Sequence, residues 1–142
     1  MLIIIDKKGG EKMTGLLIVT HGNFGKELLK SCEMIFGEIP ECKAFGLARD
    51  ESLQELKEEI QPFIDSHDSI FCMVDLFGGS PSNVANAFAK QKKNMIVATG
   101  VNMSMVFGAV EARNMEKDVN EMAKEAVNAA SEATKVIDQL SA

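Results

Sequence analysis

The chain of 142 residues contains no tryptophan and no tyrosine, and only three prolines and three cysteines. Tryptophan and tyrosine are the residues that most often stack on flavin, nucleobase and sugar rings, so their absence argues against a site built on an aromatic platform. No apolar run is longer than five residues, whereas a membrane-spanning helix needs roughly 18 or more. The sequence therefore predicts a soluble protein.

The three cysteines are widely spaced and surrounded by apolar residues. Cys32, Cys42 and Cys72 include no Cys-x-x-Cys pair of the kind used for zinc binding or redox chemistry. Structural disulfides are rare in the reducing cytosol. We therefore expect three reduced core thiols in a cytoplasmic protein.

Positive charge is also sparse. The formal net charge is −6, and 13 lysines and two arginines are scattered along the chain. Because nucleic-acid-binding surfaces gather positive charge opposite the phosphates, the sequence argues against a nucleic-acid partner. With 46% hydrophobic and 25% charged residues, the composition is that of an ordinary globular domain, and the length is that of one domain.

The first residues differ in character from the rest. Gly9, Gly10, Glu11 and Lys12 precede Met13, and a purine-rich ribosome-binding site followed by a start codon would encode this peptide if it were read in frame. The apolar stretch before it is too short for a signal peptide. We therefore expect residues 1–12 to be a non-native or translated upstream segment and residues 13–142 to form a single domain.

From residue 15 onward, short apolar runs alternate with longer stretches of helical period. Residues 16–20, 42–47, 69–74 and 95–99 are predicted to be strands buried on both faces. Successive strand and helix units imply right-handed crossovers between parallel strands. We therefore predict an α/β fold in three layers, with a mainly parallel sheet, helices on both faces and a flavodoxin-like strand order.

Local signals set the expected helix boundaries. Ser52 and Glu55 form a capping box at the start of the second helix, and Pro62 is expected to kink or end it. Ser80 and Pro81 have the residue types of an N-cap and first turn for the third helix. The last helix is expected to run from near residue 116 to the end, because a stripe of small and apolar residues continues to Leu140.

Ligands of such sheets meet the carboxyl ends of the strands near the point where the strand order reverses. His21 follows the first predicted strand, and Asp75 ends the third. The carboxylate can accept the proton of one imidazole nitrogen and leave the other nitrogen free as a nucleophile. We expect these two residues to be catalytic.

The loops at this edge also contain groups that can bind an anion. Gly78 and Gly79, followed by Ser80, offer backbone N–H groups at the positive end of a helix. Thr20 and Asn102 add a hydroxyl and an amide in the neighbouring loops. Taken singly, these residues are also typical of caps and turns. Taken with His21 and Asp75, they predict a site that holds an anion against a histidine nitrogen, which the resemblance described below identifies as a phosphoryl group.

We expect no metal and no organic cofactor, because no loop offers clustered carboxylates for magnesium or a His/Cys set for zinc. The second histidine, His67, precedes the predicted strand at 69–74 and so lies at the opposite edge of the sheet. We expect it to be an exposed loop residue.

Three stretches now resemble a known family. Residues 15–22 (GLLIVTHG), 74–81 (VDLFGGSP) and 99–103 (TGVNM) are similar to the signature stretches of the IIA component of the mannose-family sugar phosphotransferase system (PTS). The similarity runs in matching order from about residue 13 to the last helix. One departure is Ser104, where the family commonly has proline, which leaves the geometry of that loop open.

The resemblance implies a phosphoryl carrier. The histidine matching His21 would accept phosphate from the phosphohistidine of the carrier protein HPr and pass it to the IIB component, which phosphorylates a sugar entering through membrane components IIC and IID. Asp75 would orient the histidine, and Ser80 would help bind the phosphoryl group. A homodimer is also expected. Phe24, Phe77 and the methionines at 103 and 105 are candidates for an apolar surface that both partner proteins cover in turn.

Two other functions remain open from the sequence. One is the related phosphocarrier subunit of a dihydroxyacetone kinase, which also has a histidine after its first strand. The other is a non-catalytic regulatory module that binds a small anion on the same fold. The sequence does not identify the sugar.

Overall fold

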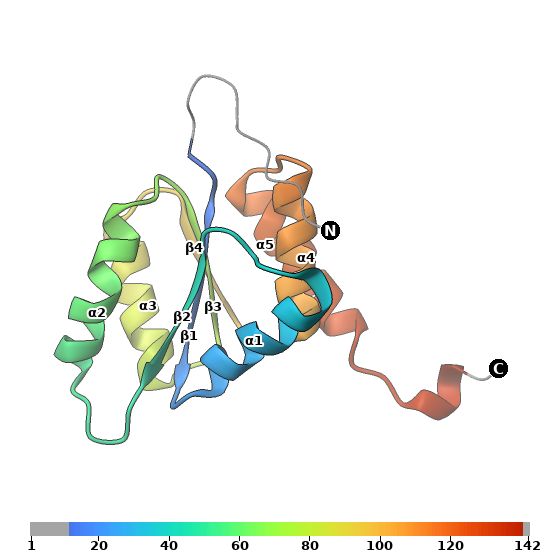
Figure 1. Ribbon diagram of the computed structural model, residues 1–142, viewed down its shortest axis with the longest axis horizontal. Helices are drawn as coiled ribbons and strands as arrows, with labels where there is room; N and C mark the ends of the chain where they lie inside the picture. The colour runs from blue at the N-terminus through green and yellow to red at the C-terminus, as the bar shows by residue number, and fades with distance from the viewer. Residues whose placement is uncertain (1–11, 141–142) are drawn as a thin grey trace.

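The computed structural model describes residues 12–140, within which the chain forms four strands and five α-helices (Figure 1). The strands are β1 (Gly15–His21), β2 (Cys42–Leu47), β3 (Ile70–Val74) and β4 (Met95–Thr99). The helices are α1 (Phe24–Phe36), α2 (Leu53–Asp65), α3 (Ser80–Gln91), α4 (Met103–Asn114) and α5 (Val119–Glu132), followed by the short 3-10 helix η2 (Ile137–Leu140). Apart from Lys12, the expected upstream segment lies outside the described residues.

The four strands form a parallel sheet in the order β2-β1-β3-β4. Helices α2 and α3 cover one face, and α1, α4 and α5 cover the other (Figure 1). Alternate residues of each central strand supply the two cores; in β1, Leu16 and Ile18 enter one core and Leu17 and Val19 enter the other. The predicted three-layer α/β fold and flavodoxin-like order are confirmed.

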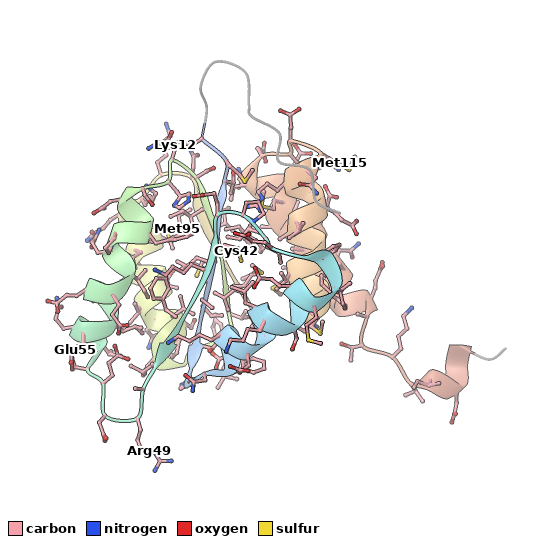
Figure 2. All side chains as sticks on the ribbon, in the orientation of Figure 1. Lys12, Cys42, Arg49, Glu55, Met95 and Met115 are labelled. Carbon is pink, nitrogen blue, oxygen red and sulfur yellow. The ribbon has the colours of Figure 1, made fainter. Side chains whose placement is uncertain are left out.

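The strand order determines which loops meet. β1 lies between β2 and β3, and the register pairs His21 with Leu47 of β2 and Val19 with Val74 of β3. The chain therefore leaves β1, β2 and β3 at the same carboxyl edge of the sheet. Figure 2 shows Arg49 on the loop that follows β2 at this edge, and Lys12 near the opposite, amino-terminal edge.

Three expected helix boundaries need correction. The capping box of Ser52 and Glu55 is present, but α2 does not end at Pro62 and continues to Asp65; proline has no N–H group, so its cost here is one hydrogen bond of the helix. Helix α3 begins at Ser80, so its N-cap is Gly79 rather than Ser80.

The last helix is shorter than the apolar stripe predicted. Helix α5 starts at Val119 and ends at Glu132, and residues 133–138 are exposed. Met115, just before the expected start of this helix, is the exposed C-cap of α4 (Figure 2). The tail leads away from the sheet (Figure 1), so its apolar residues have no core surface against which a helical face would be stabilised.

The expectation for His67 was wrong in one respect. It lies at the amino-terminal edge as predicted, but its side chain is only 5% exposed. The imidazole ring packs against Phe63, with ring centroids 4.2 Å apart, and a Cβ atom on Gly15 would lie 2.9 Å from the ring. The missing side chain at Gly15 leaves the space that the ring fills.

The three cysteines are free, as predicted; Cys32 and Cys72 are buried and Cys42 is partly buried. Burial raises the pKa of Cys32 to about 11, so this thiol remains protonated near neutral pH. No helix within residues 12–140 is long and apolar enough to cross a membrane.

Candidate functional site

His21 and Asp75 come together at the carboxyl edge of the sheet. The Asp75 carboxylate oxygen Oδ2 accepts two hydrogen bonds from His21, one from the backbone N–H at 3.0 Å and one from ring nitrogen Nδ1 at 2.9 Å. The His21 side chain is 50% exposed and that of Asp75 is 16% exposed. One carboxylate oxygen therefore fixes both the backbone and the ring of the histidine, while the ring stays accessible.

The electrostatics of Asp75 favour its charged form. Burial alone would raise the pKa of this carboxyl group, but the hydrogen bonds from the backbone and ring of His21 outweigh it, so the pKa of Asp75 is lowered. A carboxylate is an acceptor only, so Nδ1 carries the proton in the neutral ring. The lone pair of that tautomer is on Nε2, the nitrogen that Asp75 does not contact.

The start of helix α3 lies directly beside this free nitrogen. A Cβ atom on Gly79 would lie 3.0 Å from Cε1 and 3.6 Å from Nε2 of His21. Gly79 is the N-cap of α3, and no side chain caps the helix. The N–H groups of the first turn and the positive end of the helix dipole are therefore next to the nucleophilic nitrogen. Ser80 is the first residue of the helix and offers a backbone N–H group, whereas Pro81, the second residue, has none.

Gly78 and Ser80 lie in the same short segment. Gly78 has a φ of +81° and is exposed, a conformation that glycine adopts without strain. It turns the chain from the end of β3 into α3. Ser80 is partly buried at the first helical position, so both its backbone N–H and its hydroxyl belong to the helix end beside His21.

Thr20 occupies a different place from the one expected. Its side chain is fully buried. The hydroxyl oxygen accepts a hydrogen bond of 2.8 Å from the backbone N–H of Gly25, and the hydroxyl donates to the carbonyl of His21 at 3.2 Å. These contacts use the hydroxyl group within the loop that holds His21, so the geometry gives Thr20 no open group for a phosphoryl oxygen.

Asn102 is also used locally. It is the N-cap of α4, and its Oδ1 accepts a hydrogen bond of 2.8 Å from the backbone N–H of Met105. Its remaining polar group is the amide nitrogen. Ser104 lies in the first turn of α4, where proline is also well tolerated; the helix therefore begins normally with serine at this position.

Exposed apolar side chains lie close to the pair in the sequence. Phe77 is 84% exposed and Leu76 is 60% exposed in the loop after Asp75, and Phe24 is half exposed at the start of α1. Leu76 was missed by the sequence analysis, although an adjacent pair of large apolar residues in a loop is itself a signal. Met105, which was considered for this surface, is buried in the core, and Met103 is only partly exposed.

No group of three or more His, Cys, Asp or Glu residues in the range 12–140 is arranged to hold a metal ion. The carboxylate nearest to His21 is engaged by that histidine. The described site thus consists of a nucleophilic nitrogen, a positioning carboxylate and a helix N-terminus.

Comparison with known proteins identifies the family. The family model described as PTS system fructose IIA component matches residues 15–127. The chain belongs to this family. Within the phosphotransferase system, these mannose-family IIA components are parts of sugar-transport systems, and this chain is such a IIA component.

Individual relatives of this IIA component are similar over most of its length. The fructose-specific EIIA component of Bacillus subtilis is 32% identical over 105 residues, which cover 71% of each chain. The crystal structure of the EIIA component from Streptococcus agalactiae superposes with a TM-score of 0.85 at 26% identity, and covers 89% of this chain and 99% of that one.

A longer relative sets a limit on the comparison. The mannose-specific EIIAB component of Escherichia coli is 29% identical over 125 residues, which cover 86% of this chain but 39% of that protein. The described IIA component therefore spans less than half the length of this relative.

Proposed function

We propose that this IIA component carries a phosphoryl group on Nε2 of His21, which it accepts from phospho-HPr and passes to IIB. The observation that carries the proposal is the orientation of the ring: Nδ1 is held by Asp75 at 2.9 Å, while Nε2 lies beside Gly79 at the start of α3. Half of the side chain is exposed, so a partner protein can reach the free nitrogen.

Each transfer is a substitution at phosphorus. The lone pair of Nε2 attacks the phosphorus atom, the new P–Nε2 bond forms, and the P–N bond to the HPr histidine breaks with its electron pair returning to that imidazole. The proton on Nδ1 stays in its hydrogen bond to Asp75, which stabilises the positive charge that develops on the ring. In the second transfer a nucleophile of IIB attacks the same phosphorus and His21 leaves.

The start of α3 supports the anion during both steps. Three non-bridging oxygens carry negative charge in the transition state, and positioning with electrostatic stabilisation supplies most of the catalysis in phosphoryl transfer. Gly79, the N-cap of α3, lies beside Nε2 and Cε1 of the ring, and the backbone N–H of Ser80 follows it at the first helical position. Gly78 and Gly79 let the phosphoryl group approach the backbone closely. Thr20 supports the loop rather than the phosphate, whereas Asn102 caps α4 through Oδ1 and keeps its amide nitrogen as a donor for the phosphoryl group.

The exposed apolar residues around His21 support a shared docking surface. Phe24 and Leu76 lie within three residues of His21 or Asp75 in the sequence and are exposed, whereas the exposed Phe77 also lines a groove beside β4 and α5. HPr and IIB would cover this surface in turn, because both must bring a reacting group to the same nitrogen. The membrane components IIC and IID would be reached only through IIB.

Membership of the family favours the sugar system over the dihydroxyacetone kinase system. The relatives are described as fructose-, mannose- and sorbose-specific. A non-catalytic anion-binding module is the remaining alternative, and covalent labelling distinguishes it because such a module would exchange phosphate without forming a bond.

The test is labelling with radioactive phosphoenolpyruvate, enzyme I and HPr. The expected product is an acid-labile, base-stable phosphoramidate on His21. His21→Gln should abolish labelling, whereas His67→Gln should label fully if the variant is folded. Label on His67 or Asp75, or no label on the wild-type protein, would contradict the proposal.

A homodimer is also part of the proposal. The outer edge of β4 pairs with no strand within residues 12–140, and an open groove of about 740 Å³ lies between this edge and α5. Ile96, Ala98 and the exposed Val127 line the groove. A second copy would cover this apolar surface. Sedimentation velocity should give a dimer that Val127→Glu converts to a monomer; a monomeric wild-type protein would contradict this part.

A further inference from the structure

The turn that carries His21 rests on a glycine of the neighbouring strand. Gly46 of β2 pairs in register with Thr20 of β1. A Cβ atom on Gly46 would lie 1.8 Å from the carbonyl oxygen of Gly22 and 2.9 Å from its carbonyl carbon. No side chain fits between these backbones, and the atoms in contact are not part of a flexible side chain that could move aside.

The same turn is tied to β2 by a hydrogen bond. The backbone N–H of Gly22 donates to the carbonyl of Leu47 at 2.9 Å. Gly22 itself has a φ of +53° and has open space where its side chain would be. Steric demand at this turn therefore comes from Gly46 on β2, which lies outside the three sequence stretches shared with the family.

A second contact fixes the other end of the turn. The buried hydroxyl group of Thr20 links the carbonyl of His21 to the N–H of Gly25 in the first turn of α1. A Cβ atom on Gly25 would lie 2.8 Å from Ile18 and 3.0 Å from Thr20. The helix start is thus packed directly on β1. The two hydrogen bonds of the Thr20 hydroxyl group join the two ends of the segment 21–25.

We propose that Gly46 and Thr20 are positioning residues for phosphoryl transfer, which hold the backbone of residues 21–25 so that His21 presents both its N–H and its Nδ1 to Asp75. The single Oδ2 atom accepts both bonds, so the backbone of His21 and its ring must be placed together. A shift of the Gly22 peptide also moves the backbone of His21, and so breaks the two hydrogen bonds that His21 makes to Oδ2 of Asp75. This inference rests on the proposed function for its kinetic part only.

The first test compares Gly46→Ala with Gly108→Ala. Gly108 is also close to a neighbouring backbone, although less tightly than Gly46, because a Cβ atom there would lie 3.0 Å from the Cα atom of Ala126; this contact joins α4 to α5 and does not involve the turn. Both variants are measured for stability by urea unfolding. The ring tautomer of His21 is measured by ¹⁵N NMR of histidine-labelled protein at a pH where the ring is neutral.

We expect the wild-type protein and Gly108→Ala to show the tautomer with the proton on Nδ1. Gly46→Ala should lose this preference and give the mixture of a free imidazole side chain. Its rate of phosphorylation at saturating phospho-HPr should fall on the order of a hundredfold, as expected for a displacement of about 1 Å, with little change in KM. Wild-type tautomer and rate in Gly46→Ala, or equal losses in Gly108→Ala, would overturn the inference.

A second pair of variants tests the same inference if Gly46→Ala does not fold. Thr20→Val keeps the shape of the side chain but removes the hydroxyl group, whereas Thr20→Ser keeps the hydroxyl group. Thr20→Val should lose the preference for the proton on Nδ1 of His21, whereas Thr20→Ser should keep it. Equal behaviour of valine and serine would overturn the role of the hydroxyl group. Because the NMR readout needs no phosphoryl donor, a wild-type protein that fails to label would refute the proposed function and leave this inference separately testable.

Discussion

The two histidines of the chain each face a carboxylate, at opposite edges of the same sheet. At the carboxyl edge, Nδ1 of His21 contacts Asp75 at 2.9 Å and half of the side chain is exposed. At the amino-terminal edge, Nε2 of His67 contacts Glu41 at 2.7 Å and the side chain is almost fully buried. A histidine beside an acidic residue is therefore not by itself a sign of catalysis.

The difference lies in the second ring nitrogen. Nδ1 of His67 is 2.9 Å from the carbonyl oxygen of Phe63, which can only accept, so both nitrogens of His67 face acceptors. Nε2 of His21 faces the N-cap of α3 instead. A nucleophile needs an uncommitted lone pair and access, and His21 alone of the two provides both.

The amino-terminal edge is arranged to hold chain segments together. The buried guanidinium of Arg113 donates to the carbonyl of Thr14 at 3.0 Å and to that of Pro40 at 2.6 Å. His67 contacts Glu41, which follows Pro40 in the sequence. The side chains of Arg113 and His67 thus hold the loops that enter β1 and β2, whereas the carboxyl edge leaves polar groups free for a ligand.

Among variants of the two carboxylates, Asp75→Asn is expected to lower the rate of phosphoryl transfer most. The amide preserves the shape but removes the charge that selects the tautomer and stabilises the ring in the transition state. We expect normal folding and a loss of transfer rate of roughly ten- to a thousandfold, about 1.4–4 kcal/mol of barrier. Rapid-quench measurement of phosphorylation by charged HPr gives the rate.

Glu41→Gln is the matched control for that variant, because it makes the same change in the carboxylate that faces the other histidine. Its transfer rate should equal that of the wild-type protein. Equal losses in both variants, or a wild-type rate for Asp75→Asn, would show that the charge of Asp75 does not assist transfer through His21.

The next largest effect concerns stability. His67→Gln removes the ring packed on Phe63 and weakens the link to Glu41, so we expect the free energy of unfolding to fall by about 1–3 kcal/mol. His21→Gln changes an exposed ring and should alter stability much less. Urea unfolding of both variants measures the difference. A larger loss for His21→Gln would reverse the assignment of structural and reactive roles.

Local and topological rules predicted much of this molecule. The capping box of Ser52 and Glu55 and the four strands depend on residues close in sequence, and the pairing of His21 with Asp75 follows from the parallel order of the strands. The extent of α5 could not be predicted in the same way, because small residues extend a helical stripe whether or not a core lies beside it. After Glu132 there is no such surface.

Other errors arose where the decisive contact is distant in sequence. The burial of His67 depends on the space at Gly15 and on Glu41, which comes from another loop. Thr20 precedes His21 in the sequence, yet its side chain is buried and bonds to the loop backbone. A single sequence does not specify whether a threonine at this position faces a ligand or the backbone. Gly46 gives no local signal, because its role depends on the backbone of Gly22.

Acid should remove a smaller contribution. The lowered pKa of Asp75 means that its charged form stabilises the folded protein above the ordinary aspartate pKa of about 3.9, and that this contribution is lost as the pH falls through the lowered value. The difference in unfolding free energy between the wild-type protein and Asp75→Asn should therefore be steady at pH 5 and above and shrink below about pH 4. A difference that grows in acid would contradict the direction of the shift.

The smallest expected effect is that of a chelator. At the carboxyl edge, Asp75 uses Oδ2 for two hydrogen bonds to His21, and the uncapped first turn of α3 lies beside Nε2. On the proposed function, N–H groups and the helix dipole would supply the positive field for the phosphoryl oxygens. We expect transfer from HPr that was charged beforehand and freed of magnesium to proceed at the same rate with and without EDTA. Transfer that stops in EDTA and returns on addition of magnesium would show that a cation, rather than the helix end, neutralises the phosphoryl group.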